Sequence, residues 1–120
     1  MNMLNSLIIE GVVTKGLAPI PVELPAPEGK EFEVAVSRYY KKADGEMVED
    51  KSYFTVELYG NMAEHDTIIR NVYTDRGVRV VGRLKQKRWT DEEGKEHSKV
   101  VVIAEHIEFK PHVKKELPTD

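Results

Sequence analysis

The sequence contains no cysteine among its 120 residues. Disulfide bonds, thiolate metal sites and cysteine nucleophiles are therefore excluded. Long apolar runs are lacking as well: SLIIEGVV and VVVIA fall far short of the roughly 20 residues that a membrane-spanning helix needs. The opening MNMLNS has no basic segment leading into an apolar stretch, as a signal peptide would. These absences predict a cytoplasmic protein that does not enter a membrane.

Motifs for catalysis and metal binding are also lacking. The four histidines, at positions 65, 97, 106 and 112, form no i,i+4 pair, and no cysteine could complete a ligand set. No glycine-rich phosphate loop and no recognisable set of serine, histidine and aspartate is present. We therefore expect no enzyme activity, no metal and no other cofactor.

Positive charge is scarce overall but concentrated in one segment. The formal net charge is −3, yet residues 76–88 contain six basic and no acidic residues, giving +6. The rest of the chain holds the other 12 of the 18 basic residues and all 21 acidic residues, a net charge of −9. A nucleic-acid-binding site needs only one positive face, so this segregation favours binding despite the acidic total.

The first 30 residues predict one strand and one long loop. Residues 4–14 are apolar at both odd and even positions, which is typical of a strand covered on both sides, by a barrel interior and by a partner. Gly11 predicts a bend or bulge in that strand. Residues 15–30 include four prolines and predict a stiff loop instead of a helix or central strand.

A period of two predicts a hairpin over residues 31–60, with Asp44 and Gly45 at its turn. The predicted core positions are Phe32, Val34, Val36, Phe54, Val56 and Leu58. The opposite, wet face of the second strand carries Lys51, Tyr53, Thr55, Glu57 and Tyr59.

Residues 61–73 break this alternation and predict one short helix, with Asn61 as N-cap and Glu64 completing a capping box. Alternation resumes at Val78 and places Leu84 among the core-facing residues, whereas Arg83, Lys85, Lys87 and Trp89 point the other way. After a charged turn, residues 97–109 predict a final strand.

The order strand, strand, strand, helix, strand, strand leaves no room for crossovers between parallel strands. It predicts an all-β fold, a five-stranded Greek-key barrel with one short helix between strands three and four, which is the order of the OB-fold. We expect this domain to occupy residues 1–110 and a short, polar, disordered tail to occupy residues 111–120. Strands one and five are apolar on both sides, which favours a homo-oligomer.

Aromatic and basic side chains gather on the face opposite the predicted core, as a single-stranded nucleic acid would require for base stacking and phosphate neutralisation. The alternative is that the tyrosines are half-buried cross-strand partners and the cations are ordinary solubilising charges. Tyr40 shares parity with Val36, so it reaches this face only through a bulge near Ser37 or a strand that runs past the barrel rim. The expected contact residues are Tyr40, Tyr53, Tyr59, Trp89, Arg38, Lys41, Lys42, Lys51, Arg83, Lys85 and Lys87.

Three segments resemble the bacterial single-stranded-DNA-binding protein (SSB) family: MLNSLIIEG, FEVAVSRYYKKADGEMVEDKSYFTVELYG and RGVRVVGRLKQKRWTDEEGKEHSKVVVIAEHIEF. The resemblance covers nearly all of residues 3–109. It implies a homotetramer of OB-folds that binds single-stranded DNA without sequence preference in replication, recombination and repair. It also implies a nucleoid-associated location, replication and repair proteins as partners, and stacking by Tyr40, Tyr53, Tyr59 and Trp89.

The chain departs from the family pattern in three places. The proline-rich first loop lacks the usual charged run, so we expect fewer phosphate contacts there. Tyrosine occupies three of the four stacking positions, so fluorescence should report almost only Trp89. The sequence stops at KKELPTD, without the family's long linker and acidic tip, so we expect partner recruitment to be absent, carried by a missing segment or arranged differently.

Two other functions fit the same pattern. The domain could be a paralogous OB-fold that serves as a protein-interaction module of a replication-restart complex. RNA could replace DNA as the ligand, because stacking and phosphate contacts do not sense the 2′-hydroxyl.

Overall fold

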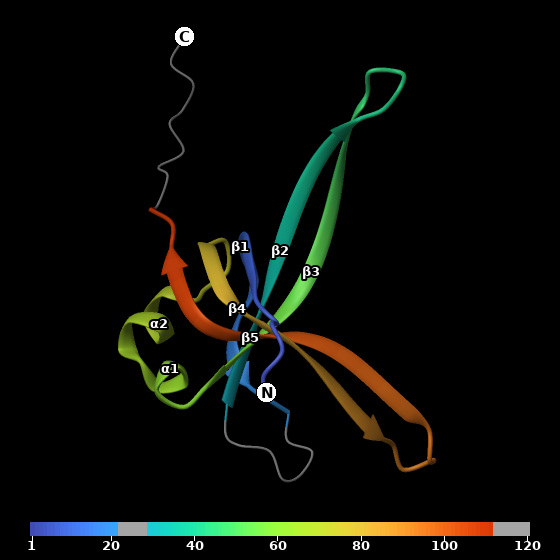
Figure 1. Cartoon of the computed structure of the whole chain (residues 1–120). Helices are drawn as coiled ribbons and strands as arrows, with labels where there is room; N and C mark the ends of the chain where they lie inside the picture. Colours follow the sequence, from blue (N-terminus) through green and yellow to red (C-terminus); the bar gives the residue numbers. More distant parts are fainter. Residues whose placement is uncertain (22–28, 112–120) are drawn as a thin grey trace.

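The structure, a computed structural model, describes residues 1–21 and 29–111. Its elements follow in the order β1 (Leu7–Pro19), β2 (Gly29–Lys41), β3 (Met47–Tyr59), α1 (Asn61–Glu64), α2 (Asp66–Asn71), β4 (Gly77–Thr90) and β5 (Glu96–Phe109). The strands close into a barrel in the order β1-β2-β3-β5-β4 (Figure 1). This confirms the predicted all-β OB-fold. Neither helix in the described ranges has the length and apolar character needed to span a membrane.

The barrel interior is built from the positions that alternation assigned to it. Phe32, Val34, Val56 and Leu58 are at most 2% exposed, and the β4 residues Val78 and Val80 join them. Because side chains of a strand alternate between faces, this packing commits the intervening residues of β2, β3 and β4 to the outer surface.

Two long hairpins extend beyond the barrel in different directions, β2–β3 and β4–β5 (Figure 1). Their length raises the radius of gyration to 17.3 Å, against about 14 Å for a compact chain of this size. Two predicted core residues lie where the hairpins leave the barrel. Phe54 is 38% exposed and lies two residues before Val56, which pairs with β5. Leu84 is 47% exposed and lies two residues after Gly82, the last residue of β4 that pairs with β1. Both lie on the core side of their strands, but the prediction that they are buried in the core was wrong, because they lie beyond the end of the barrel.

The first strand differs from its predicted limits. It begins at Leu7, which leaves Leu4 exposed outside it, and it continues to Pro19, so the predicted loop over residues 15–30 starts too early. Pro19 ends β1 opposite Lys30, a position where a missing backbone N–H costs little. Residues 22–28 of the predicted loop and residues 112–120 of the predicted tail lie outside the described residues.

Gly11 is not the site of a bulge. The register shifts of β1 against β2 fall between Val13 and Lys15 and between Lys15 and Ala18. A Cβ at Gly11 would instead overlap the Ala35 carbonyl, so glycine is needed there for close approach of β1 to β2.

The chain between β3 and β4 forms two short helices where one was predicted, because His65 is extended (φ −74°, ψ 120°) and separates them. The N-cap of α1 is Gly60, with φ 62°, and no side chain of the described residues caps this helix. Asn61 already belongs to the first turn, so the predicted capping box with Glu64 does not form.

Candidate nucleic-acid interface

The aromatic residues of β3 and the basic strip of β4 lie on one surface. Strand β5 separates these two strands, and its Ile103 is aligned with Glu57 on one side and with Arg83 on the other. Laterally aligned residues of a sheet share a face, and side chains two residues apart share it too. Tyr53 and Tyr59 therefore lie on the same outer face as Lys85, Lys87 and Trp89. Tyr53 is 57% exposed there, whereas Tyr59 is half-buried.

The two adjacent tyrosines of β2 point to opposite sides of the hairpin. The β2–β3 ladder runs without a register shift from Gly29 opposite Tyr59 to Lys41 opposite Met47, so the bulge proposed near Ser37 is absent from this ladder. Tyr40 is exposed because β2 runs past the barrel rim, but it stays on the side of Val36. Ala35 pairs with Tyr53, and alternation from Ala35 brings Tyr39, not Tyr40, to the face of Tyr53.

Tyr39 was thus missed by the sequence reasoning. It is 65% exposed. Strict alternation along KEFEVAVSRYYK would have identified it, because Tyr39 shares parity with Ala35, whereas Tyr40 needs a break in the alternation to reach this face.

The predicted cationic residues divide into two groups. Some are already paired with carboxylates: Lys87 with Glu57, Lys51 with Glu49 (Nζ–Oε1 3.5 Å) and Lys42 with Glu46 (Nζ–Oε2 3.9 Å). The others make no ion pair within residues 1–21 and 29–111, and all are exposed: Arg38, Lys41, Arg83 and Lys85. Only the second group offers positive charge that no carboxylate of the described chain neutralises.

Arg79, at the start of the basic segment, stabilises the barrel. Its Nε donates to Glu10 Oε1 at 2.7 Å and its Nη1 to Glu108 Oε2 at 3.3 Å, which ties β4 to β1 and β5. Hydrogen bonds from Lys110 and Arg79 lower the pKa of Glu10 below its usual value. Part of the positive charge in residues 76–88 is therefore neutralised by carboxylates of β1 and β5.

Glu57 was predicted to lie on a wet face, and this was wrong: its side chain is fully buried. The Tyr59 hydroxyl donates to Glu57 Oε1 at 2.7 Å, and Lys87 forms an ion pair with Oε2. Burial, and then the hydrogen bond to Glu57, raise the pKa of the Tyr59 hydroxyl well above its usual value.

Trp89 lies near the end of the β4–β5 hairpin, stacked on His97 with ring centroids 5.5 Å apart and an interplanar angle of 18°. His97 Nε2 lies 2.7 Å from Asp91 Oδ2 in the turn. Trp89 remains 37% exposed, beside an open hollow of about 390 Å³ whose lining includes Arg88 and His97. The hairpin thus presents an aromatic platform with a hollow next to it.

The described ranges contain no group of three or more histidine, aspartate or glutamate side chains placed to hold a metal ion. The surface described above consists of aromatic rings and cations on three neighbouring strands. Such a surface can stack bases and neutralise phosphates.

The single-strand binding protein family has a model that matches residues 4–110 of this sequence. The chain belongs to this family. It is 40% identical over 109 residues to the single-stranded DNA-binding protein of Aquifex aeolicus, covering 88% of this chain and 69% of that protein. It is 33% identical over 113 residues to the single-stranded DNA-binding protein of Helicobacter pylori, covering 89% of this chain and 58% of that protein. The chain therefore spans about 58–69% of the length of these relatives.

Solved structures of the family share its fold. A chain of the Plasmodium falciparum SSB complex with ssDNA superposes with a TM-score of 0.75 at 16% identity, over 92% of this chain and 98% of that one. The small single-stranded DNA-binding protein from Streptomyces coelicolor gives a TM-score of 0.66 at 21% identity, over 92% and 96% of the two chains.

Proposed function

We propose that this protein binds single-stranded DNA without strong sequence preference on the outer face of β3, β5 and β4 and along the β2–β3 hairpin. The observation that carries this proposal is the alignment of exposed tyrosines with unpaired cations on one continuous surface. The chain's membership of the single-strand binding protein family supports the same function. The protein acts by binding alone and protects the strand during replication, recombination and repair.

Each class of side chain has a separate role in this proposal. Bases stack on aromatic rings whatever their sequence, at about 1–3 kcal/mol per base. The rings on the shared face are Tyr39, Tyr53, Tyr59 and Trp89. Phosphates are neutralised by exposed cations that carry no carboxylate partner within the described residues. Lys41, Arg83 and Lys85 lie on the shared face, and Arg38 lies on the other side of the β2–β3 hairpin, with Tyr40.

We further propose that the protein assembles through β1 into a homo-oligomer, a tetramer by analogy with the family. Ile8 and Val12 support this, because they are 66% and 43% exposed on a strand of the barrel. An exposed apolar strand face is a common site of association. Replication and repair proteins remain proposed partners.

The decisive experiment is a titration of the protein with thymidine oligomers, followed through the fluorescence of Trp89. We expect quenching, and an affinity that falls with salt at a slope of about −3, from about −0.7 for each of four neutralised phosphates. No quenching together with a flat salt response would disprove the proposal.

The same titration separates the two alternative functions. A matched RNA oligomer that displaces DNA at equal concentration would identify RNA as an equivalent ligand. A partner protein retained at high salt, with no oligonucleotide binding, would instead indicate a protein-interaction module.

A further inference from the structure

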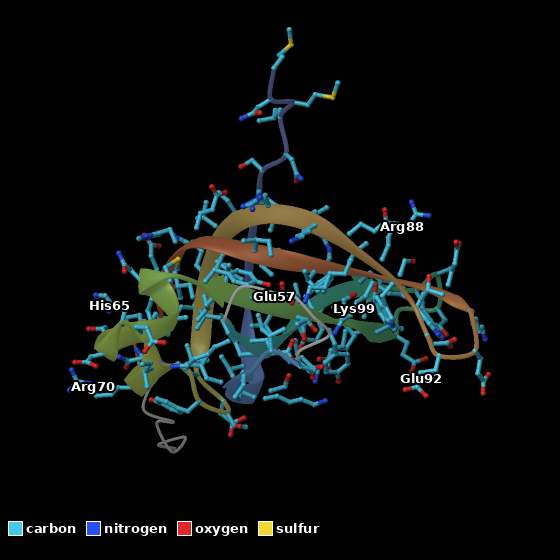
Figure 2. The ribbon with its side chains drawn as sticks, turned by 90° about the horizontal axis from the view of Figure 1, so that it is seen from below. Glu57, His65, Arg70, Arg88, Glu92 and Lys99 are labelled. Atoms are coloured by element: carbon cyan, nitrogen blue, oxygen red, sulfur yellow. The ribbon has the colours of Figure 1, made fainter. Side chains whose placement is uncertain are left out.

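A buried carboxylate lies in the surface proposed to bind an anionic strand. Glu57 is on the outer face of β3, between Tyr53 and Tyr59, yet it is fully shielded from solvent (Figure 2). Other acidic residues, such as Glu92 at the tip of the β4–β5 hairpin, extend into solvent (Figure 2). Burial of an ionised carboxylate is costly unless charge and hydrogen bonds compensate it.

Both oxygens of Glu57 have a partner from the same face. Oε1 accepts the hydrogen bond of the Tyr59 hydroxyl at 2.7 Å, and Oε2, which accepts no hydrogen bond within the described residues, forms an ion pair with the Lys87 ammonium group. Lys87 lies on β4 and Glu57 on β3, so the lysine side chain crosses the intervening strand β5. Only 28% of that lysine side chain is exposed.

The segment of β5 beneath this contact is shielded from water. Ile103 of β5 is aligned with Glu57 on the outer face, and Val101 lies two residues away on the same side. They are 5% and 2% exposed, although they do not point into the barrel. An ion pair in such surroundings is harder to break than one in solvent, since losing one partner leaves an uncompensated buried charge.

We propose that Glu57 is a positioning residue of the DNA-binding face: it holds the Tyr59 ring in place through the hydroxyl and withholds Lys87 from the phosphates. This inference rests on the proposed function. Of the two neighbouring lysines on the β4 strip, Lys85 then neutralises phosphate and Lys87 does not. The raised pKa of Tyr59 is consistent with this role, because it keeps the hydroxyl protonated as a donor.

The salt dependence of binding distinguishes the two lysines. We expect Lys85→Gln to reduce the slope of log affinity against log salt by about 0.7, the value for one phosphate contact on a single strand. Lys87→Gln should leave the slope unchanged. Glu57→Gln keeps an acceptor for Tyr59 and frees Lys87, so its slope should steepen by about 0.7. Equal loss of slope in Lys85→Gln and Lys87→Gln would overturn the withholding of Lys87.

The positioning of Tyr59 has its own variant. Tyr59→Phe keeps the stacking ring and removes the hydroxyl, so we expect affinity for a thymidine oligomer to fall about 3- to 10-fold, the equivalent of one hydrogen bond, at an unchanged salt slope. Wild-type affinity in this variant would show that the hydroxyl does not position the ring.

A measurement without DNA keeps this inference separable from the proposed function. Lys87→Gln should lower the urea midpoint of the otherwise unchanged protein, and it should have little effect in a Glu57→Gln background, because the buried charge is then gone. Equal destabilisation in both backgrounds would refute the ion pair. If the urea coupling is found but no oligonucleotide binds, the proposed function fails while the Glu57 contact stands.

Discussion

Side-chain direction decides which residues of the β2–β3 hairpin can act together. Tyr39 and Tyr40 are neighbours in the chain and both are more than half exposed, but only Tyr39 shares the face of Tyr53. An uninterrupted ladder leaves no freedom to exchange them, because a one-residue slip would move every side chain of β2 to the other face.

This geometry sets a matched pair of variants. Tyr39→Ala should weaken binding of a thymidine oligomer by about 1–3 kcal/mol, the value of one stacked base, and Tyr40→Ala should weaken it much less. Quenching of Trp89 measures both affinities. A greater loss in Tyr40→Ala would show that the strand follows the other side of the hairpin.

The turn beyond Trp89 contains a pH-sensitive carboxylate. A hydrogen bond with His97, and then backbone N–H groups of Lys95 and Glu93, lower the pKa of Asp91 below its usual value of 3.8. A carboxyl with a lowered pKa in the folded state stabilises that state above its unfolded pKa, and the effect is lost as pH falls through the folded value.

We therefore expect wild-type protein to have a higher urea midpoint than Asp91→Asn at pH 6–7, and the two midpoints to converge as pH falls below 3.8. Urea unfolding followed by Trp89 fluorescence measures this. Asp75→Asn is the comparison: it makes the same change of side chain in another turn, the one before β4, away from His97. A difference between wild type and Asp91→Asn that persists unchanged at low pH would contradict the assignment.

Among the elements, β4 contains the glycine of the described residues at which an added Cβ would come closest to another atom. Gly82 lies at the register shift of the β4–β5 ladder, and a Cβ on it would overlap the carbonyl oxygen of Ile103. The close approach of β4 to β5 places Arg83 and Ile103 directly opposite each other on the proposed binding face.

Gly82→Ala should destabilise the protein by about 1–3 kcal/mol, the usual cost of forcing extra atoms into a packed site. Gly16→Ala is the control, because a Cβ there would meet nothing closer than the Val72 carbonyl oxygen at 3.7 Å. Equilibrium urea unfolding measures both. Similar midpoints for the two variants would show that β4 can shift to accommodate a methyl group.

For the whole molecule, exposed apolar side chains and unpaired positive charge lie on different strands. Ile8 and Val12 expose apolar surface on β1, while Arg83 and Lys85 lie on the outer face of β4. A chain of net charge −3 thereby has a positive face for an anionic strand. On β1 it has exposed apolar side chains on either side of the Glu10–Arg79 ion pair, which we propose for self-association.

Light scattering tests the association. Ile8→Glu should reduce the molar mass in solution, because a charge at a buried apolar interface is strongly unfavourable. Ile69 is another exposed isoleucine, 40% exposed on α2, and Ile69→Glu should leave the mass unchanged. If Ile8→Glu keeps the wild-type mass, association does not use this face of β1.

Local pattern was sufficient for the number and order of the strands. The period of two along Phe32–Val36 and Val56–Leu58, and the break in alternation after Tyr59, determined the number and order of strands, because burial of one face is a property of each strand alone. The concentration of positive charge in residues 76–88 is likewise a property of the sequence, and so is the alternation that places Tyr53, Tyr59 and Trp89 opposite the core.

Tertiary structure alone decided which of these side chains remain unpaired and exposed to a ligand. Alternation placed Glu57 and Lys87 on the outer face but could not show that they meet across β5, since that contact depends on the closing order of the barrel. The exposure of Phe54 and Leu84 depends likewise on where the hairpins leave the barrel. Sequence determines the side of a strand on which a residue lies, whereas what covers that side is determined by strands distant in the chain.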